Sequence, residues 1–202
     1  MHINDWNAEE VQKAEMRWGE KLPPYILEMF HFAAFPKASI LDLGCGFGRF
    51  LEYLLELNED PDYIGYDSSP AMIDRITERF PFYSARIFNR DITDPITHKQ
   101  QSIICSAVFI HNTLETQEKV LQNIKAVSPD AFTFDINCPS EKWLLKSDHF
   151  ERFNAGFRMT WQSHYSMTRK LLDMFPNYSL STSLYSLPGS RHKAVYKLSK
   201  GE

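Results

Sequence analysis

The spacing of hydrophobic positions predicts that strands and helices alternate through the middle of the chain. Short apolar runs suited to buried strands alternate with segments whose apolar residues recur every three or four positions, as on one face of a helix. We expect strands at about 39–43, 62–66, 85–89, 101–109 and 131–136, with helices at about 47–57, from Ser69, and at about 116–126. Such alternation is typical of a mostly parallel sheet that carries helices on both faces.

Two helices are expected before the first strand. Residues 7–20 carry apolar side chains along one stripe, and Asn7 and Glu10 have the spacing of a capping box. The second helix, at about 24–34, is apolar nearly all round. It begins with Pro24, which suits a first turn because the N–H that proline lacks has no partner there.

The end of the chain has another pattern. Residues 141–165 show no clean period. We expect Ser166 to cap a short helix that ends at Phe175, followed by two alternating strands at 178–187 and 193–198. The turn between these strands joins them into a hairpin, so the sheet is expected to end with an antiparallel pair.

Length and charge narrow the classes of function. The 202 residues, 43% hydrophobic and 24% charged, suffice for one folded domain and are not typical of disorder. Lys and Arg number 22 against 26 Asp and Glu, a formal charge of −4 with no basic block, so DNA is not an expected partner and RNA is disfavoured. The acidic N-terminus lacks a signal-peptide pattern, and no apolar run reaches the roughly 20 residues that span a bilayer. We therefore expect a cytoplasmic protein, not bound to a membrane, with its three cysteines reduced.

A glycine-rich turn follows the first expected strand. It reads Asp42-Leu43-Gly44-Cys45-Gly46-Phe47-Gly48. Glycines at such a turn let the backbone approach a ligand beside the free N–H groups of a helix start. The spacing is not the G-x-G-x-x-G of dinucleotide sites, because position 49 is Arg, and no P-loop sequence is present. A nicotinamide cofactor is therefore disfavoured.

The glycine-rich turn resembles motif I of the class I S-adenosylmethionine-dependent methyltransferases. Three later segments resemble further motifs of that family in the same order: IGYDSSPAMI from Ile64, NRDI from Asn89, and SIICSAVFIHN from Ser102. The resemblance covers roughly residues 39–198. It implies a doubly wound, Rossmann-like α/β fold whose seven-stranded sheet has the order 3-2-1-4-5-7-6, mostly parallel with an antiparallel terminal hairpin. Ser102 departs from the family, which usually has an acidic residue at the start of strand four.

The same resemblance implies a cofactor, S-adenosylmethionine, with S-adenosylhomocysteine as its product. The glycines would allow close backbone approach, Asp67 would bind both ribose hydroxyls, and Asp91 with Ile92 would hold the adenine. Asp42 either tunes the amino end of the cofactor or only holds the turn. The residues implied in cofactor binding are Asp42, Gly44, Cys45, Gly46, Gly48, Asp67, Ser68, Met72, Asp91, Ile92 and Ser106.

His111, after the fourth expected strand, is the candidate catalytic residue. It is either a base that takes a proton from a hydroxyl or amine, or a residue that only lines the pocket. Four aromatic residues are candidates for the wall of a substrate pocket or for ordinary core: Trp18, Tyr25, Phe157 and Trp161. The cysteine spacings match no zinc pattern, so no metal is expected.

We expect a single methyltransferase domain over residues 1–202. Within it, 1–38 would be an N-terminal helical lid, 39–140 the cofactor-binding core, 141–165 a substrate-lid insertion, and 166–202 the last helix and hairpin. The expected function is S-adenosylmethionine-dependent methyl transfer to an oxygen or nitrogen nucleophile of a small molecule. Two alternatives keep the fold: an RNA or protein methyltransferase, and a non-catalytic protein that binds S-adenosylmethionine.

Overall fold

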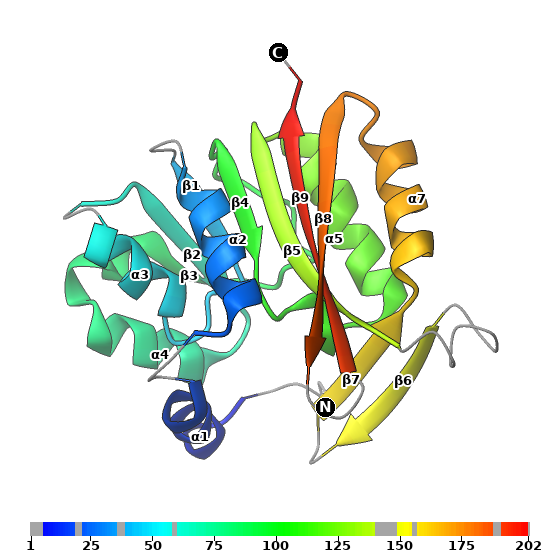
Figure 1. The fold of residues 1–202 in the computed structure, drawn as a ribbon. Helices are drawn as coiled ribbons and strands as arrows, with labels where there is room; N and C mark the ends of the chain where they lie inside the picture. Colours follow the sequence, from blue (N-terminus) through cyan, green and yellow to red (C-terminus); the bar gives the residue numbers. More distant parts are fainter. Residues whose placement is uncertain are drawn as a thin grey trace.

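A mixed sheet crosses the part of the chain that the computed structural model describes, residues 6–18, 22–35, 39–57, 60–139, 149–154, 157–187 and 191–201. Its strands are β1 (Ile40–Leu43), β2 (Tyr63–Asp67), β3 (Ile87–Asn89), β4 (Ser102–Cys105), β5 (Ala131–Cys138), β6 (His149–Asn154), β7 (Phe157–Gln162), β8 (Tyr178–Leu187) and β9 (Arg191–Lys200). Strands β3, β2, β1, β4 and β5 lie side by side in that order and run parallel. Strand β9 pairs antiparallel with β5, and β8 pairs antiparallel with β9 (Figure 1).

The order of these seven strands is the one expected from the family resemblance. Because β9 lies between β5 and β8, the sheet reads 3-2-1-4-5-7-6 when β8 and β9 are counted as the sixth and seventh strands. The mostly parallel fold with an antiparallel end is therefore confirmed. The hairpin of β6 and β7 is an addition to it, within the segment in which the sequence shows no clean period. Strand β7 runs parallel to β5, with Trp161 beside Asn137, beyond the end of β4.

Helices cover both faces of the sheet. They are α1 (Ala8–Trp18), α2 (Pro24–Ala34), α3 (Arg49–Leu57), α4 (Pro70–Arg79), α5 (Leu114–Val127) and α7 (His164–Met174), with short 3₁₀ helices η1 (Pro81–Arg86) and η2 (Phe109–His111). Successive strand residues point to opposite faces. Ile40 and Ile104 join the apolar core beneath α2 and α3, whereas Leu41 and Ile103 join the core beneath α5 and α7. Figure 1 shows α2 in front of the sheet and α5 behind it.

Polar side chains set two of the helix starts. The capping box of α1 is formed as expected, since Asn7 N donates to Glu10 Oε2 at 2.9 Å and Glu10 N donates to Asn7 Oδ1 at 3.0 Å. The cap of α7 is Ser163 rather than Ser166, so this expectation is wrong by about one turn. Ser166 is the donor of the capping bond, because its N–H reaches Ser163 Oγ. Two serines three residues apart offer two candidate caps, and the helix begins after the earlier one.

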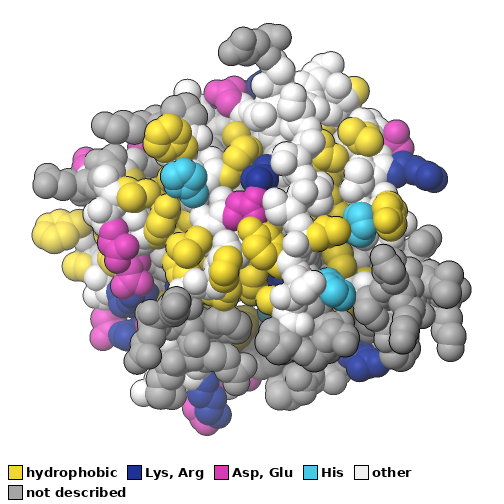
Figure 2. Space-filling view, viewed as in Figure 1, with side chains coloured by type: hydrophobic (Ala, Val, Ile, Leu, Met, Phe, Trp, Pro, Cys, Tyr) yellow, Lys and Arg dark blue, Asp and Glu magenta, His cyan; other side chains and the backbone are white. Residues whose placement is uncertain are grey.

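A polar cluster fastens α2 to the terminal hairpin. Glu28 of α2 accepts from Ser183 Oγ at 2.6 Å, from Tyr185 OH at 2.5 Å and from the ammonium of Lys197. Figure 2 shows acidic and basic side chains meeting near the middle of this face of the molecule, among hydrophobic ones. Within the described residues, no helix combines the length and apolar character that crossing a membrane requires.

Candidate active site

A large cavity opens at the carboxyl ends of the parallel strands. Its volume is about 990 Å³. The loops after β1, β2, β3 and β4 line one part of it, and residues of α2, β5, β7 and β9 line much of the rest, together with Trp6, Arg49, Thr116 and Leu187. Open α/β sheets bind ligands outside the carboxyl ends of the strands, where the strand order reverses. In this sheet the order reverses between β1 and β4, which is where the cavity lies.

The glycines of the turn after β1 have different surroundings. A Cβ on Gly44 would lie 2.3 Å from Val108 Cγ2, so the missing side chain lets this turn pack against the loop after β4. Gly46 has a φ of +54°, and beside it there is open space up to Met72 Sδ at 3.8 Å. Gly44 and Gly46 line the cavity. Gly48 is not among the described residues that line it, and a Cβ there would meet Ile76 of α4 at 2.8 Å, so Gly48 serves helix packing.

Asp67, the last residue of β2, is oriented by two backbone N–H groups. Its Oδ2 accepts from Gly46 N and its Oδ1 from Ser69 N, both at 2.9 Å. Burial raises the pKa of the Asp67 carboxyl, and the two backbone hydrogen bonds oppose that rise. A carboxylate offers about four lone-pair sites. Asp67 therefore keeps acceptor capacity for a ligand while it stays fixed to the glycine turn, and Ser68 beside it is exposed in the cavity.

The loop after β3 supplies Asp91 and Ile92 to the cavity. Asp91 is exposed, and its Oδ1 accepts from Thr93 N at 2.8 Å, which is the bond of a local turn. Ile92 is half-buried and packs against the core of the sheet. Both line the same cavity as the glycine turn, and the turn geometry of Asp91 leaves its second oxygen for other partners.

Three further expected cofactor residues have distinct surroundings. Cys45 and Met72 are buried and line the cavity, and burial raises the pKa of the Cys45 thiol well above its usual value, so this residue acts as an apolar wall. Ser106 lines the cavity too, and its buried Oγ has no hydrogen-bond partner among the described residues. A buried hydroxyl without a partner is costly unless a ligand or water satisfies it.

Asp42 lies beneath the glycine turn rather than at the cavity surface. It is 3% exposed, and Tyr63 OH donates to its Oδ2 at 2.9 Å. Burial raises the pKa of Asp42 to about 7, against the hydrogen bond from Tyr63. Because Asp42 is not among the described lining residues, direct contact with a ligand would require the turn to move.

His111 is held in one tautomer. Its Nδ1 lies 2.9 Å from the carbonyl oxygen of Arg158 on β7, and a carbonyl only accepts, which assigns the ring proton to Nδ1. Nε2 is then the basic nitrogen of the neutral ring. Burial lowers the pKa of His111, and the hydrogen bond to Arg158 opposes that effect. The ring lines the cavity, with Trp6 edge-on to it at a centroid distance of 6.4 Å.

A buried ion pair lies at the end of the cavity formed by β5 and β9. Lys193 Nζ is 2.5 Å from Asp135 Oδ2, and both residues are at most 5% exposed. Asp135 Oδ1 accepts from Ala107 N at 2.6 Å, which holds the loop after β4 where Ala107 has a φ of +59°. A left-handed alanine is sparsely populated and persists only where its surroundings fix it. Lys193 lines the cavity, and nothing in its local sequence marks it.

Two of the four aromatic residues considered for the wall of a substrate pocket can be placed in the structure. Tyr25 and Trp161 line the cavity, whereas the side chains of Trp18 and Phe157 lie outside the described part of the chain. Met159 is a lining residue that sequence reasoning missed. The sequence does contain a pattern that indicates a strand here and puts Met159 on the same face as Trp161. Apolar and polar residues alternate along β7: Phe157, Arg158, Met159, Thr160, Trp161 and Gln162.

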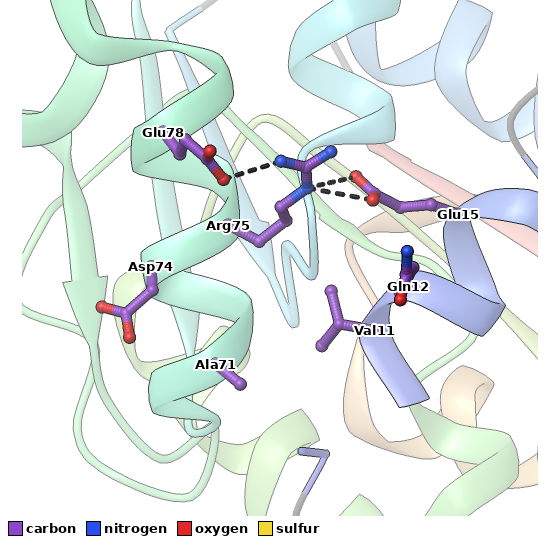
Figure 3. Close-up of a pocket in the computed structure, with 7 residues that line it drawn as sticks. All are labelled: Val11, Gln12, Glu15, Ala71, Asp74, Arg75 and Glu78. Carbon is purple, nitrogen blue, oxygen red and sulfur yellow. Dashed lines mark hydrogen bonds and ion pairs between the residues drawn. The ribbon is translucent and has the colours of Figure 1, made fainter. Parts of the chain in front are cut away.

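A second cavity of about 690 Å³ lies between α1 and α4. Figure 3 shows Arg75 reaching across it from α4. Arg75 Nε is 2.8 and 2.9 Å from the two carboxylate oxygens of Glu15 on α1, and Arg75 Nη1 is 2.7 Å from Glu78 Oε2. The pair of Arg75 with Glu15 therefore joins α1 to α4. Within the described residues, no group of three or more metal-ligating side chains comes together.

The central part of the chain matches a known family. Residues 41–130 match the family model described as a methyltransferase domain. No curated protein sequence matches the chain. Among solved structures, the chain is similar to the magnesium protoporphyrin IX methyltransferase ChlM of Synechocystis PCC 6803, crystallised with S-adenosylhomocysteine. The identity is 14%, 96% of this chain and 95% of that chain are covered, and the TM-score is 0.66.

Two other solved structures extend this comparison. The 1,6-didemethyltoxoflavin-N1-methyltransferase of Burkholderia thailandensis is 14% identical over 96% of this chain and 85% of its own, with a TM-score of 0.66. The small RNA methyltransferase HEN1 is 14% identical over 88% of this chain and 25% of its own, with a TM-score of 0.64. At such identities the likeness is one of fold. The central part of the chain thus matches a methyltransferase-domain model, and the fold is that of solved S-adenosylmethionine-dependent methyltransferases. Both findings support the expected enzyme class and cofactor.

Proposed function

We propose that the protein transfers the methyl group of S-adenosylmethionine to an oxygen or nitrogen atom of a small molecule. One observation carries this proposal. A single cavity joins the glycine turn and Asp67 at one end to His111, a neutral and oriented histidine, at the other. The first end suits a nucleoside, and the second supplies a group able to accept a proton.

The residues at the first end fit the cofactor. Gly46 leaves open space at the turn, and Asp67 has acceptor capacity for the two ribose hydroxyls. Asp91 and Ile92 are the proposed adenine contacts, and the unpartnered hydroxyl of Ser106 is available to a polar group of the ligand. S-adenosylmethionine supplies an electrophilic methyl group on a sulfonium. The chain's part is to hold the acceptor in line with that methyl group and to exclude water.

His111 is the proposed base. Nε2 takes the proton from the acceptor hydroxyl or amine as the new bond to the methyl carbon forms and the bond from that carbon to sulfur breaks. The products are the methylated acceptor, S-adenosylhomocysteine and a proton on His111. The carbonyl of Arg158 holds Nδ1–H throughout, so the ring does not turn away from the acceptor.

Two segments are the proposed lid. Helix α1 lies over α4, and Trp6, just before it, both lines the cavity and accepts from Ser69 Oγ through its carbonyl at 2.9 Å. The hairpin of β6 and β7 brings Met159 and Trp161 to the other side. Both segments would cover a bound acceptor and keep water from the methyl group.

A small acceptor is favoured over RNA by the charge of the molecule. Binding to a phosphate backbone draws most of its affinity from a basic surface. The formal charge is −4, and among the described side chains on the face in Figure 2 the Lys and Arg residues are scattered rather than gathered into a continuous field. A non-catalytic binding protein is the second alternative, which predicts cofactor binding with no methyl transfer to any acceptor.

The first prediction concerns Asp67 and is tested by isothermal titration. We expect S-adenosylmethionine and S-adenosylhomocysteine to bind in the micromolar range and NAD not to bind. In Asp67→Ala, affinity for both ligands should fall at least about tenfold, since two charge-assisted hydrogen bonds to the ribose are lost.

Asp62→Ala is the matched control for this titration. Asp62 precedes β2 at the opposite end of the strand and is exposed, so its removal should leave the affinity unchanged. Both variants are checked for folding by thermal unfolding. Equal affinities in wild type and Asp67→Ala would remove the ribose assignment, and no binding to the wild type would remove the proposed function.

A further inference from the structure

Charged side chains line the main cavity in two groups. Asp67, Asp91 and Asp94 belong to β2 or to the loop after β3, where the cation Arg90 accompanies them, and Arg49 follows the glycine turn at the start of α3. Lys193 on β9 is the charged lining residue on the other side of β5. A ligand that reaches Lys193 must offer its ammonium a hydrogen-bond acceptor.

Contacts with β5 hold Lys193 in place at the cavity wall. It stands opposite Asn137 in the pairing of β5 with β9, and Asp135, two residues before Asn137, holds its ammonium at 2.5 Å. Asp135 is fully buried and is not among the described lining residues. The Asp135 carboxylate thus binds the Lys193 ammonium on the side away from the cavity, and Lys193 itself lines the cavity. An ammonium has three N–H donors and no acceptor, so its ligand partner must be an acceptor.

The balance of charge favours an anion beside Lys193. Arg49 and Lys193 stand against one buried carboxylate, Asp135, with Asp42 largely protonated below pH 7 because burial raises its pKa to about 7. These charges leave an excess of +1, and S-adenosylmethionine, with a sulfonium, an ammonium and a carboxylate, adds a further +1. One carboxylate on the acceptor would offset half of this excess and would supply the acceptor oxygens that the Lys193 ammonium requires.

Two aromatic side chains line the cavity near the strands β5 and β9 that carry the ion pair of Lys193. The Lys193 ammonium lies 5.3 Å from the centroid of the Tyr25 ring. Trp161 pairs with Asn137 from β7, on the side of β5 away from β9. Tyr25 and Trp161 both line the cavity. Aromatic lining residues beside a cation suit a planar apolar body that carries the anionic group.

We propose that the acceptor is a planar carboxylic acid, with its carboxylate bound by Lys193 and its ring between Tyr25 and Trp161. This inference rests on the proposed function and narrows its substrate class. Arg49 follows the glycine turn directly and is placed nearer the cofactor, so Lys193 is the cation that selects the acceptor.

The test measures binding of matched probes to the protein saturated with S-adenosylhomocysteine. The probes are 4-hydroxybenzoate and 1-hydroxy-2-naphthoate, each beside its neutral carboxamide. Isothermal titration should give at least one acid that binds at least about tenfold more tightly than its amide. In Lys193→Met this preference should fall below about twofold, with the affinity for S-adenosylhomocysteine unchanged.

Lys197→Met is the matched control. Lys197 lies on the same strand and the same face, and it pairs with Glu28 away from the cavity, so the acid preference should persist. Because Lys193→Met leaves Asp135 buried without its partner, Lys193→Met/Asp135→Asn is measured beside it. The amide that Asp135→Asn introduces still offers an oxygen to Ala107 N, so the double variant keeps that loop contact.

The outcomes separate the two proposals. If S-adenosylhomocysteine fails to bind the wild type, the proposed function fails. If it binds but neither acid binds more tightly than its amide, only the carboxylate inference is wrong. An acid preference that survives in the double variant would also overturn the assignment to Lys193.

Discussion

At the scale of single residues, His111 shows how a distant backbone group sets the chemistry of a side chain. The Arg158 carbonyl fixes the proton on Nδ1, and burial lowers the pKa of the ring. A base must be neutral at the working pH, and the lowered pKa makes His111 neutral at pH 7.

The prediction for His111 is a titration followed by NMR. Its ring should stay neutral with the proton on Nδ1 at pH 7 and titrate below the ordinary value of 6.5. The unfolded chain then binds more protons than the folded one as the pH falls below 6.5, so this residue contributes stability that is lost on acidification. Loss of a signal in His111→Gln assigns the ring resonance of His111. In the same variant, the free energy of unfolding should fall less steeply as the pH is lowered below 6.5. A pKa at or above 6.5, or a proton on Nε2, would contradict the role as base.

How far these residues can be predicted depends on their separation along the chain. The glycine turn and Asp67 are recognisable from the sequence because the turn follows β1 and Asp67 ends β2, each within a local motif. Lys193 is not recognisable, because its partner Asp135 lies 58 residues away and only the antiparallel pairing of β5 with β9 brings them together. The same holds for the Arg158 carbonyl beside His111, a contact across 47 residues.

At the scale of elements, α1 is held at one edge of the cavity by few contacts. Val11 packs against Met72 and Phe47, and the ion pair of Glu15 with Arg75 joins α1 to α4 (Figure 3). Met72 also lines the main cavity beside the glycine turn, where we propose that the cofactor binds. The attachment of α1 and the binding of the cofactor are therefore expected to be coupled.

The prediction for α1 is tested by hydrogen exchange. In Arg75→Gln, amides of residues 8–18 should exchange faster, and S-adenosylhomocysteine should slow them less than in the wild type. Overall stability should change by less than about 1 kcal/mol, since both side chains are partly exposed. Lys170→Gln, which breaks a comparable pair between α7 and α5, is the control. Unchanged exchange of α1 in Arg75→Gln would show that the ion pair does not hold this helix.

Helices and strands could be predicted where their apolar residues recur at a regular spacing. Helices α2, α3, α4 and α5 match the sequence pattern to within about two residues because each has an apolar face. The expected strand at 101–109 is too long, because β4 ends at Cys105 and the apolar residues after it form a loop with a left-handed Ala107 and the 3₁₀ helix η2. The hairpin of β6 and β7 escaped prediction because β6 lacks alternation and β7 is only six residues long. Tertiary contact with the end of β5 and with η2 supplies what its own sequence does not.

At the scale of the whole molecule, the cavity connects parts of the fold that are far apart in sequence. Trp6, Asp67, His111, Trp161 and Lys193 all line it. Two cores on opposite faces of one sheet support these residues, and the strands that separate the cores are buried on both sides. A ligand in the cavity is therefore expected to stabilise the molecule as one unit rather than one half of it.

The last prediction concerns the stabilisation of the whole molecule by a ligand in the cavity, and it is measured by thermal unfolding. A ligand that binds only the folded state adds about 2.7 kcal/mol to the free energy of unfolding at a hundred times its Kd. For a chain of this size that corresponds to a rise in Tm of roughly 5–10 °C. S-adenosylhomocysteine should raise the Tm of the wild type by this amount in a single transition. At the same concentration it should raise the Tm of Asp67→Ala much less. NAD should leave the Tm of the wild type unchanged. Two transitions of which only one moves would show that the terminal hairpin unfolds independently of the cofactor end.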